Sequence, residues 1–455
     1  MVAATQAMNA RIPAAPALVR ISSIILWAAA LAGLAVAVLA TGRFLTTRAT
    51  LFLVAAVGAA LLAVILARAA RAAAVHRVQL SIALVSTVVA VYACEAALWW
   101  YSPRTAVGDR LRAMAGLDDR SILSVLQTLR LQGTMALPPV VPQTFFDRPR
   151  TLQPLAGAAN RYTVQCNEAG RWLFYQSDAH GFNNPPAAWS QPTDILILGD
   201  SYMHGMCVPN DESVAARLRA RWPGTLNLGQ AGNGPLTMYA ALREYGVARR
   251  PNVVLWAFYE GNDLEDLERE RRQSILMQYL DPTFTQRLAE RQPEIDSAVE
   301  ALFASELTRT LQRETQARPL PPARDLADLW QLRALLGLIH VPRNYAAFAD
   351  ILKRAQSAVQ SWNGHLYLVY LPVWTPALER RGAANRKRDQ LLAAIQPLGI
   401  PVIDLYPLFQ ERGPRKLMVG TRRYQGHYNA EGYRVVATAI SDSIQRLLHP
   451  ATTRR

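Results

Sequence analysis

Three long apolar runs in the first hundred residues constrain this 455-residue chain more than any other feature. Residues 21–42 carry no charged side chain, a second run lies between Arg48 and Arg68, and a third covers 78–100, interrupted by Glu95. Each run is close to the roughly 20 residues that a helix needs to cross the hydrocarbon core of a bilayer. The sequence therefore predicts a transmembrane anchor in residues 1–101, with helices at about 21–42, 49–67 and 78–100.

Arginines near the ends of these runs do not decide the orientation of the anchor, although cytoplasmic loops usually carry the excess of positive charge. The two sides are nearly balanced, with Arg11, Arg20, Arg68, Arg71 and Arg77 against Arg43, Arg48, Arg104, Arg110 and Arg112. Trp99, Trp100 and Tyr101 are typical of a membrane interface where the chain leaves the bilayer.

Charge and cysteine content exclude several other classes of protein. The formal net charge is +15, but no dense basic run with interleaved aromatic residues is present, so a nucleic-acid partner is not expected. There is no CxxC motif or Cys/His cluster to suggest a metal. Cys94 lies in the third run, whereas Cys166 and Cys207 fall in the remainder. They form either a disulfide, which would fit an oxidising compartment, or two buried thiols.

Residues 102–190 are predicted to be a connector, with an amphipathic helix at 110–131 and a hairpin whose strands flank 167–170. From 191 to 450, strands and helices alternate. The expected strands are continuous apolar runs at 195–198, 225–228, 253–257, 366–371 and 402–405. Such runs indicate an α/β domain with a parallel five-stranded sheet covered on both faces. A charged helical insertion at about 264–343 interrupts the alternation, either as a lid over a site or as a solvated decoration.

The first of these strands ends in Gly199-Asp200-Ser201. A serine between the carboxyl end of a parallel strand and the start of a helix presents its hydroxyl beside free backbone N–H groups. Those donors favour a developing oxyanion. The segment is not the GxSxG elbow of ordinary α/β-hydrolases, because the second glycine is absent.

Three further loops complete a recognisable series: 227–232 after the second strand, 260–263 after the third, and 427–433 before the last helix. In this order the blocks resemble the SGNH/GDSL hydrolase family over about residues 192–450, with the insertion excluded. The resemblance implies a flavodoxin-like, three-layer α/β/α fold without a cofactor. It also implies that Ser201 is the nucleophile, that His427 takes its proton, and that Ser201, Gly232 and Asn262 donate to the oxyanion.

Two positions depart from the family pattern. Glu260 stands where a glycine is usual, and Tyr424 occupies the place of the aspartate three residues before the histidine. Three explanations remain open: a Ser–His dyad oriented by the backbone carbonyl of Tyr424, a carboxylate from elsewhere, or loss of activity. We favour the dyad, and we expect Asp404, the first alternative carboxylate, not to orient His427.

The resemblance implies a serine esterase or O-acyltransferase that acts on O-acyl, chiefly O-acetyl, esters of extracytoplasmic glycans through a Ser201 acyl-enzyme. It places the chain in the inner (cytoplasmic) membrane as a multi-pass protein, with the N-terminus inside and residues 102–455 outside, where a membrane-bound acyltransferase is a candidate partner. Two alternatives are a lipase acting on membrane lipids and a non-catalytic domain that binds glycan or scaffolds a membrane assembly.

Overall fold

The computed structural model describes residues 15–47, 50–100, 118, 120–146, 152–168, 170–314, 326–329, 332–333, 344–374, 378–421 and 424–448. The chain forms two compact units. The first comprises residues 1–105 and 320–339, and the second comprises 106–319 and 340–455.

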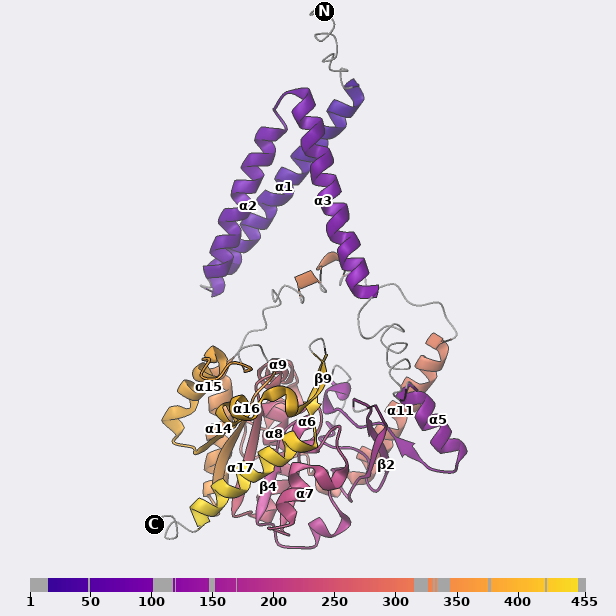
Figure 1. Ribbon diagram of the computed structural model, residues 1–455, viewed down its shortest axis with the longest axis vertical. Helices are drawn as coiled ribbons and strands as arrows, with labels where there is room; N and C mark the ends of the chain where they lie inside the picture. Colours follow the sequence, from indigo (N-terminus) through magenta and orange to yellow (C-terminus); the bar gives the residue numbers. More distant parts are fainter. Residues whose placement is uncertain are drawn as a thin grey trace, which may run out of the picture. The chain divides into compact units, whose positions relative to one another are not determined.

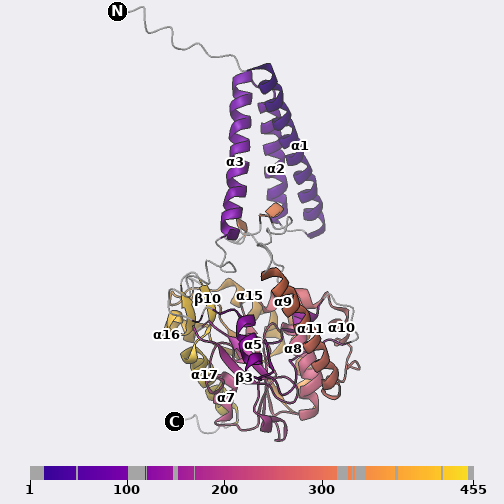
Figure 2. The same ribbon diagram turned by 90° about the vertical axis from the view of Figure 1, so that its right-hand side faces the viewer.

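The first unit contains three long helices, α1 (Pro16–Thr47), α2 (Thr50–Ala69) and α3 (Ala74–Trp100), drawn in indigo and violet in Figures 1 and 2. α1 contacts both of the others. Small residues allow the close approach: a Cβ added at Gly33 would lie 3.3 Å from the Cβ of Ala63. The Ser81 hydroxyl donates a hydrogen bond of 2.8 Å to the Ser22 hydroxyl. Small side chains and buried hydroxyl pairs of this kind are typical of helices that associate in lipid.

Among the described residues, two of these helices meet the length and composition expected of a membrane span: Pro16–Gly42 and Ala74–Trp99. α2 itself is 20 residues long and strongly apolar, and Leu53–Ala69 is the part of it that counts among the shorter apolar helices of the described residues. The middle run does form the predicted helix, and its crossing of the membrane stays a prediction.

The second unit is built on a parallel sheet of five strands in the order β5-β4-β6-β7-β8. Its strands are β4 (Ile195–Leu198), β5 (Thr225–Asn227), β6 (Val253–Tyr259), β7 (His365–Leu371) and β8 (Val402–Asp404). In chain order this is 2-1-3-4-5, the doubly wound order of flavodoxin-like folds. Nearly every strand residue is buried, which explains the continuous apolar runs in the sequence. The predicted five-stranded parallel sheet is confirmed.

Helices cover both faces of this sheet. α7 packs against α17, which also contacts β8, whereas α14 packs against α8, α9 and β7 (Figure 1). Right-handed crossovers require this division, because the chain reverses its direction across the sheet after β5. The helices of the α/β core are α6 (Ser201–His204), α7 (Val214–Arg219), α8 (Pro235–Ala241), α14 (Tyr345–Gln360), α15 (Arg386–Ile395), α16 (Tyr406–Arg412) and α17 (Ala430–Leu448).

The connector packs into the same unit. Its elements are α5 (Ile122–Leu131), β1 (Ala136–Leu137), β2 (Tyr162–Cys166) and β3 (Leu173–Gln176). β2 and β3 form the expected antiparallel hairpin, while β1 adds to β2 in parallel. Leu126, Leu155 and Phe182 are fully buried in the core that the connector shares with the sheet. The part of the predicted helix at 110–117 lies outside the described residues.

Within the insertion the structure describes α9 (Asp263–Glu270), α10 (Ser274–Gln278) and α11 (Gln292–Glu314). Near the C-terminus, β9 (Met418–Thr421) and β10 (Tyr424–Tyr428) form an antiparallel pair just before α17. The expected lid role rests partly on residues 315–325 and 334–343, which lie outside the described residues.

Candidate active site

Ser201 is the first residue of α6, directly after β4. β4 and β6 adjoin where the strand order reverses, and this switch point is where open α/β sheets bind ligands. Asp200 caps the helix, because its carboxylate accepts the Tyr202 backbone N–H at 3.0 Å. The N–H of Ser201 has no acceptor among the described residues, as expected for the first turn of a helix. It is thus available to a ligand oxygen.

His427 lies in β10, and its Nε2 is 2.8 Å from the Ser201 Oγ. The structure therefore brings together the two residues that the sequence predicted as nucleophile and base, 226 positions apart. About one-fifth of the His427 side chain is exposed, so the pair is accessible from solvent.

Glu168 orients the imidazole. Its Oε1 is 2.9 Å from His427 Nδ1, and its Oε2 accepts the His427 backbone N–H at 2.7 Å. Because a carboxylate accepts at Nδ1, that nitrogen carries the proton, and Nε2 is free to accept the Ser201 hydroxyl. The dyad oriented by the Tyr424 carbonyl was therefore the wrong prediction. The second of the three explanations, a carboxylate from elsewhere, is the one that the geometry matches.

The local backbone explains how a glutamate from the connector reaches this histidine. A Cβ added at Gly426 would lie 2.7 Å from Glu168 Oε2 and 2.6 Å from the Val419 carbonyl oxygen. A side chain at 426 would therefore displace the carboxylate. Since position 424 carries tyrosine rather than aspartate, the acid comes from the β2–β3 turn instead of from the strand that carries His427.

The other expected carboxylate, Asp404, is engaged elsewhere. At the end of β8 it forms an ion pair with Arg388, and its Oδ1 accepts the Tyr406 backbone N–H at 3.0 Å. Its carboxylate thus braces α15 and the start of α16, and the prediction that Asp404 does not orient His427 is confirmed.

Gly232 lies in the loop after β5 with φ +78°, a conformation that favours glycine. Space also requires a glycine, because an added Cβ would lie 2.3 Å from Val141 Cγ1. Its carbonyl accepts the Gln143 side-chain N–H at 2.8 Å. The Gly232 N–H has no acceptor among the described residues. The connector thus holds the residue that the sequence identified as the second oxyanion donor, through the carbonyl on the far side of its Cα.

Asn262 follows β6 and precedes α9. Its side-chain amide donates one hydrogen bond of 2.7 Å to Asp266 Oδ2. An amide NH₂ group has two donors, so the second N–H remains available. Arg269 in turn pairs with Asp266 at 3.0 Å and lies 3.4 Å from the Gln143 amide oxygen. One polar network therefore supports both Gly232 and Asn262.

The acidic neighbours of the motif residues serve the backbone. Asp263 Oδ2 accepts the Tyr259 N–H at 2.9 Å, and Asp200 caps α6, so both are loop braces as predicted. Burial raises the pKa of the Asp200 carboxyl, against the opposing effect of the Tyr202 N–H, and burial likewise raises the pKa of Asp263.

His204, the competing histidine, is fully buried and points away from the Ser201 hydroxyl. Its Nε2 is 2.9 Å from the Tyr175 hydroxyl, and its Nδ1 accepts the Ala231 N–H at 3.2 Å. Burial lowers its pKa to about 3, so the ring stays neutral. It joins the hairpin to the nucleophile helix as a structural residue.

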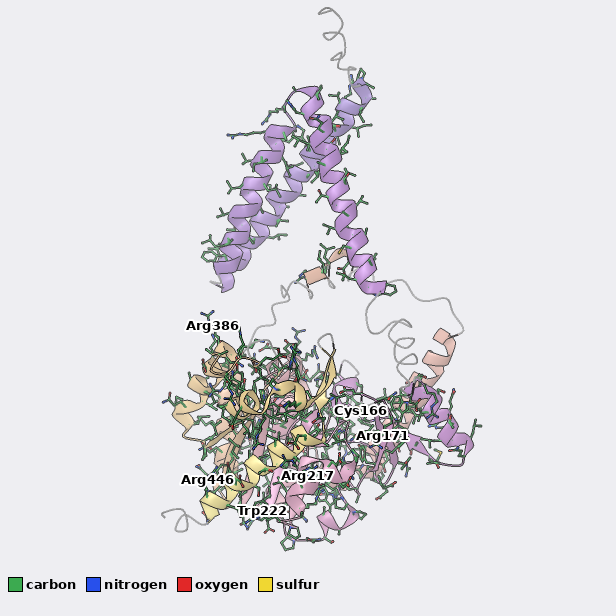
Figure 3. The ribbon with its side chains drawn as sticks, viewed as in Figure 1. Cys166, Arg171, Arg217, Trp222, Arg386 and Arg446 are labelled. Carbon is green, nitrogen blue, oxygen red and sulfur yellow. A yellow bond between two sulfur atoms is a disulfide. The ribbon has the colours of Figure 1, made fainter. Side chains whose placement is uncertain are left out.

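Cys166 and Cys207 form a disulfide, so the first of the two alternatives for these cysteines holds. Cys166, labelled in Figure 3, ends β2, and Cys207 follows α6. With Glu168, their ligand atoms lie within 4.8 Å of one another, a spacing that could hold a metal ion. The bond between the sulfurs removes the thiolates that such a site would need.

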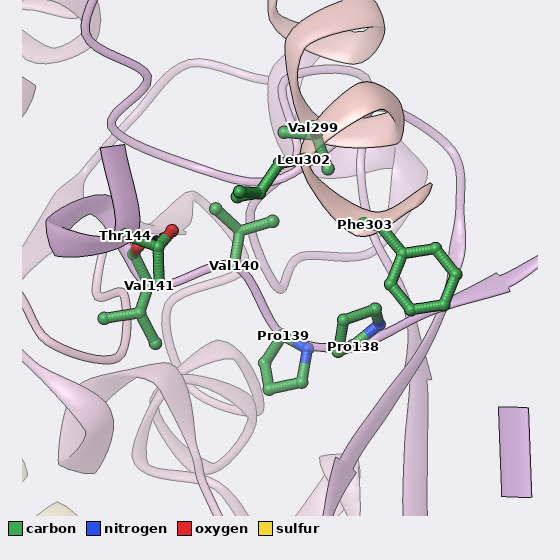
Figure 4. Close-up of a pocket in the computed structure, with 8 residues that line it drawn as sticks. All are labelled: Pro138, Pro139, Val140, Val141, Thr144, Val299, Leu302 and Phe303. Carbon is green, nitrogen blue, oxygen red and sulfur yellow. Dashed lines mark hydrogen bonds between the residues drawn. The ribbon is translucent and has the colours of Figure 1, made fainter. Parts of the chain in front are cut away.

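An apolar pocket of about 400 Å³ adjoins the Gly232 loop. In Figure 4, the connector segment 138–144 forms one wall, and Val299, Leu302 and Phe303 of α11 form the other. Val141 lines the pocket and also lies against Gly232, so this side chain borders both the pocket and the oxyanion loop.

Glu168 and the support from Val141 and Gln143 were not found from the sequence. One signal for Glu168 was present: a disulfide between Cys166 and Cys207 would bring an acid two residues from one cysteine toward a serine six residues from the other.

No family model matches the chain, and no curated protein matches it. Solved structures with partial similarity include a lipase/acylhydrolase from Enterococcus faecalis, with 14% identity and a TM-score of 0.32 over 56% of this chain and 95% of that one. A mutant acetyl-xylooligosaccharide esterase from Geobacillus has 14% identity and a TM-score of 0.30, over 55% of this chain and 93% of that one. An acetyl xylan esterase has 13% identity and a TM-score of 0.29, over 55% of this chain and 98% of that one. At these values the functional proposal rests on the geometry of the site.

Proposed function

We propose that this chain is a membrane-anchored serine esterase or O-acyltransferase that acts on O-acyl, chiefly O-acetyl, esters of extracytoplasmic glycans. The observation that carries the proposal is the continuous chain of hydrogen bonds from Ser201 through His427 to Glu168. An unassisted serine is a weak nucleophile, and an adjacent base held by a third group activates it.

The reaction follows from this arrangement. Ser201 Oγ attacks the ester carbonyl while His427 Nε2 takes the hydroxyl proton, and Glu168 stabilises the imidazolium that forms. The oxyanion receives hydrogen bonds from the N–H groups of Ser201 and Gly232 and from the Asn262 amide. His427 then protonates the leaving alcohol. Water attacks the acyl-enzyme in hydrolysis, and a sugar hydroxyl attacks it in transfer.

The membrane and the compartment enter the proposal through other observations. All exposed large hydrophobic side chains among the described residues lie on α1, α2 and α3, except Leu131, Met135 and Val402. An apolar surface of that extent needs lipid or protein to cover it. The Cys166–Cys207 disulfide favours an oxidising compartment, which supports placing the second unit outside the inner membrane. A membrane-bound acyltransferase that supplies the acyl group remains a candidate partner.

The non-catalytic alternative loses its main support. It rested on the missing acid at position 424, and Glu168 supplies a carboxylate at the corresponding ring nitrogen. A binding or scaffolding domain would have no need of this alignment.

Labelling with a fluorophosphonate probe tests the proposal, because only an activated serine reacts quickly. We expect the full chain in detergent to label at one site, and Ser201→Ala to remove the label. A wild-type protein that neither labels nor hydrolyses a soluble acetyl ester would refute the enzymatic proposal.

A second candidate, a lipase acting on membrane lipids, is favoured by the apolar pocket beside Gly232. Pockets that bind ligands are mostly apolar and of comparable volume. A chain-length series of 4-nitrophenyl esters separates the two candidates. An acetyl preference supports the glycan esterase, whereas higher kcat/KM for octanoate, lost in Leu302→Trp, supports the lipase.

A further inference from the structure

We propose that the Cys166–Cys207 disulfide is a positioning element of the catalytic site, which holds Glu168 against His427 and makes turnover sensitive to reductant. This inference rests on the proposed function, and it adds to that function a redox dependence of one catalytic group.

Both sulfurs lie at the hydrogen-bonded chain. The Glu168 backbone N–H lies 3.4 Å from Cys166 Sγ, and His427 Nδ1 lies 3.4 Å from Cys207 Sγ. Glu168 is therefore two positions beyond Cys166, and the His427 ring that its carboxylate binds contacts the sulfur of Cys207. The two sulfurs thus contact both partners of the Glu168–His427 hydrogen bond.

The disulfide also joins the two parts of the chain that must stay in register. Cys166 ends β2 in the connector, whereas Cys207 follows the helix that begins with Ser201. Among the described residues it is the covalent link between the turn that carries Glu168 and the nucleophile segment. A carboxylate on a turn needs such support to keep its geometry to within about half an ångström.

The body of the hairpin has separate attachments to the nucleophile segment. The Gln165 side chain donates to the Gly205 carbonyl at 3.2 Å, and the Tyr175 hydroxyl is 2.9 Å from His204 Nε2. Both contacts are buried. Because they do not involve the sulfurs, cleavage of the disulfide should loosen the turn, which keeps its hydrogen bonds with Asp118, without detaching β2 and β3. We therefore expect a loss of catalytic alignment rather than unfolding.

The reduction step is an ordinary thiol–disulfide exchange. A dithiol such as dithiothreitol supplies two electrons and two protons, the S–S bond breaks, two protein thiols form, and the reductant closes to its own disulfide. The freed thiols and Glu168 could then bind a metal ion, so the measurement is made in the presence of EDTA.

The test measures kcat and KM for 4-nitrophenyl acetate with the full chain in detergent, for wild type and Glu168→Gln, each oxidised and reduced. Reduction should lower wild-type kcat by about ten-fold or more with little change in KM, since losing the acid of a triad costs up to about 10⁴-fold. In Glu168→Gln the same reduction should change kcat by less than about two-fold, because the two changes act on one group.

Two controls accompany this comparison. Cys94→Ser removes the exposed free cysteine of the first unit and should keep the full response to reductant. The double variant Cys166→Ser, Cys207→Ser should match the reduced wild type without any reductant, and circular dichroism should be unchanged in both.

A wild-type kcat that is insensitive to reduction overturns the proposal. Equal losses in wild type and Glu168→Gln also overturn it, because they would mean that the disulfide acts on stability and not through the acid. Failure of the proposed function looks different: the oxidised wild type would neither turn over the ester nor react with the fluorophosphonate probe.

Discussion

The loops at the carboxyl edge of the sheet and the β2–β3 turn of the connector meet at His427, yet they are built by different means. Ser201 and Asn262 each follow a strand of the parallel sheet, and their positions are set by strand register. Glu168 stands on a turn held by a disulfide and by contacts of the hairpin body. The sheet thus supplies the nucleophile and oxyanion donors, whereas the connector supplies the group that orients the base.

This division predicts which substitutions lower kcat most, and the largest loss is expected for a residue that follows a strand of the sheet. Ser201→Ala removes the nucleophile and should lower kcat for an acetyl ester by about 10⁶-fold, as in other hydrolases that form an acyl-enzyme. The fold should be unchanged, because the hydroxyl contacts His427 at the surface of the unit. Retention of wild-type turnover by the purified variant would remove Ser201 from the mechanism.

On the connector side, Glu168→Gln should lower kcat by about 10³- to 10⁴-fold, because an amide at Nδ1 can stabilise the wrong tautomer of His427. The matched control is Asp404→Asn, a second carboxylate after a strand, which pairs with Arg388 and should cost only a few-fold. The opposite ranking, with circular dichroism unchanged in both variants, would transfer the role of the acid to Asp404.

The same contrast explains how far the sequence could lead. Continuous apolar runs identify buried parallel strands, and the residues that follow such strands meet at one edge, so Ser201, Gly232 and Asn262 could be placed together. Glu168 could not be placed with them from the sequence, because no local pattern links a residue in a hairpin turn to a histidine 259 residues away. The long apolar runs of the first hundred residues likewise suffice to identify helices, and the middle run forms α2 as predicted.

The oxyanion hole tests whether the connector also supports the sheet-borne loops. Asn262→Ala removes one donor and should lower kcat by about 10²- to 10³-fold. Gln143→Ala leaves every donor in place but frees the Gly232 carbonyl, so a loss of about ten-fold or less is expected. Equal losses of kcat in the two variants would make Gln143 as important as a direct donor. A loss of less than a few-fold for Asn262→Ala would mean that Asn262 is only a helix cap.

The smallest effect concerns stability, and it comes from a carboxyl buried beneath the sheet-borne loops. Glu270 on α9 accepts the Gly234 N–H at 2.7 Å and the Leu236 N–H at 2.8 Å, and so it caps α8 just after the oxyanion loop. Burial nevertheless raises its pKa to about 7 from the ordinary value of 4.5.

A raised carboxyl pKa means that the folded state holds its proton over a range where the unfolded chain has released it. Stability is therefore greatest below about pH 4.5 and falls as the pH rises through about 7, by about 1–3 kcal/mol for this group. Glu270→Gln cannot titrate. It should be less stable than wild type at pH 5, because one of the two N–H groups loses its acceptor, and the difference should narrow by pH 8. Tm values followed by tryptophan fluorescence at the two pH values measure this change. A constant difference would mean that Glu270 is ionised throughout, with the two backbone donors outweighing burial.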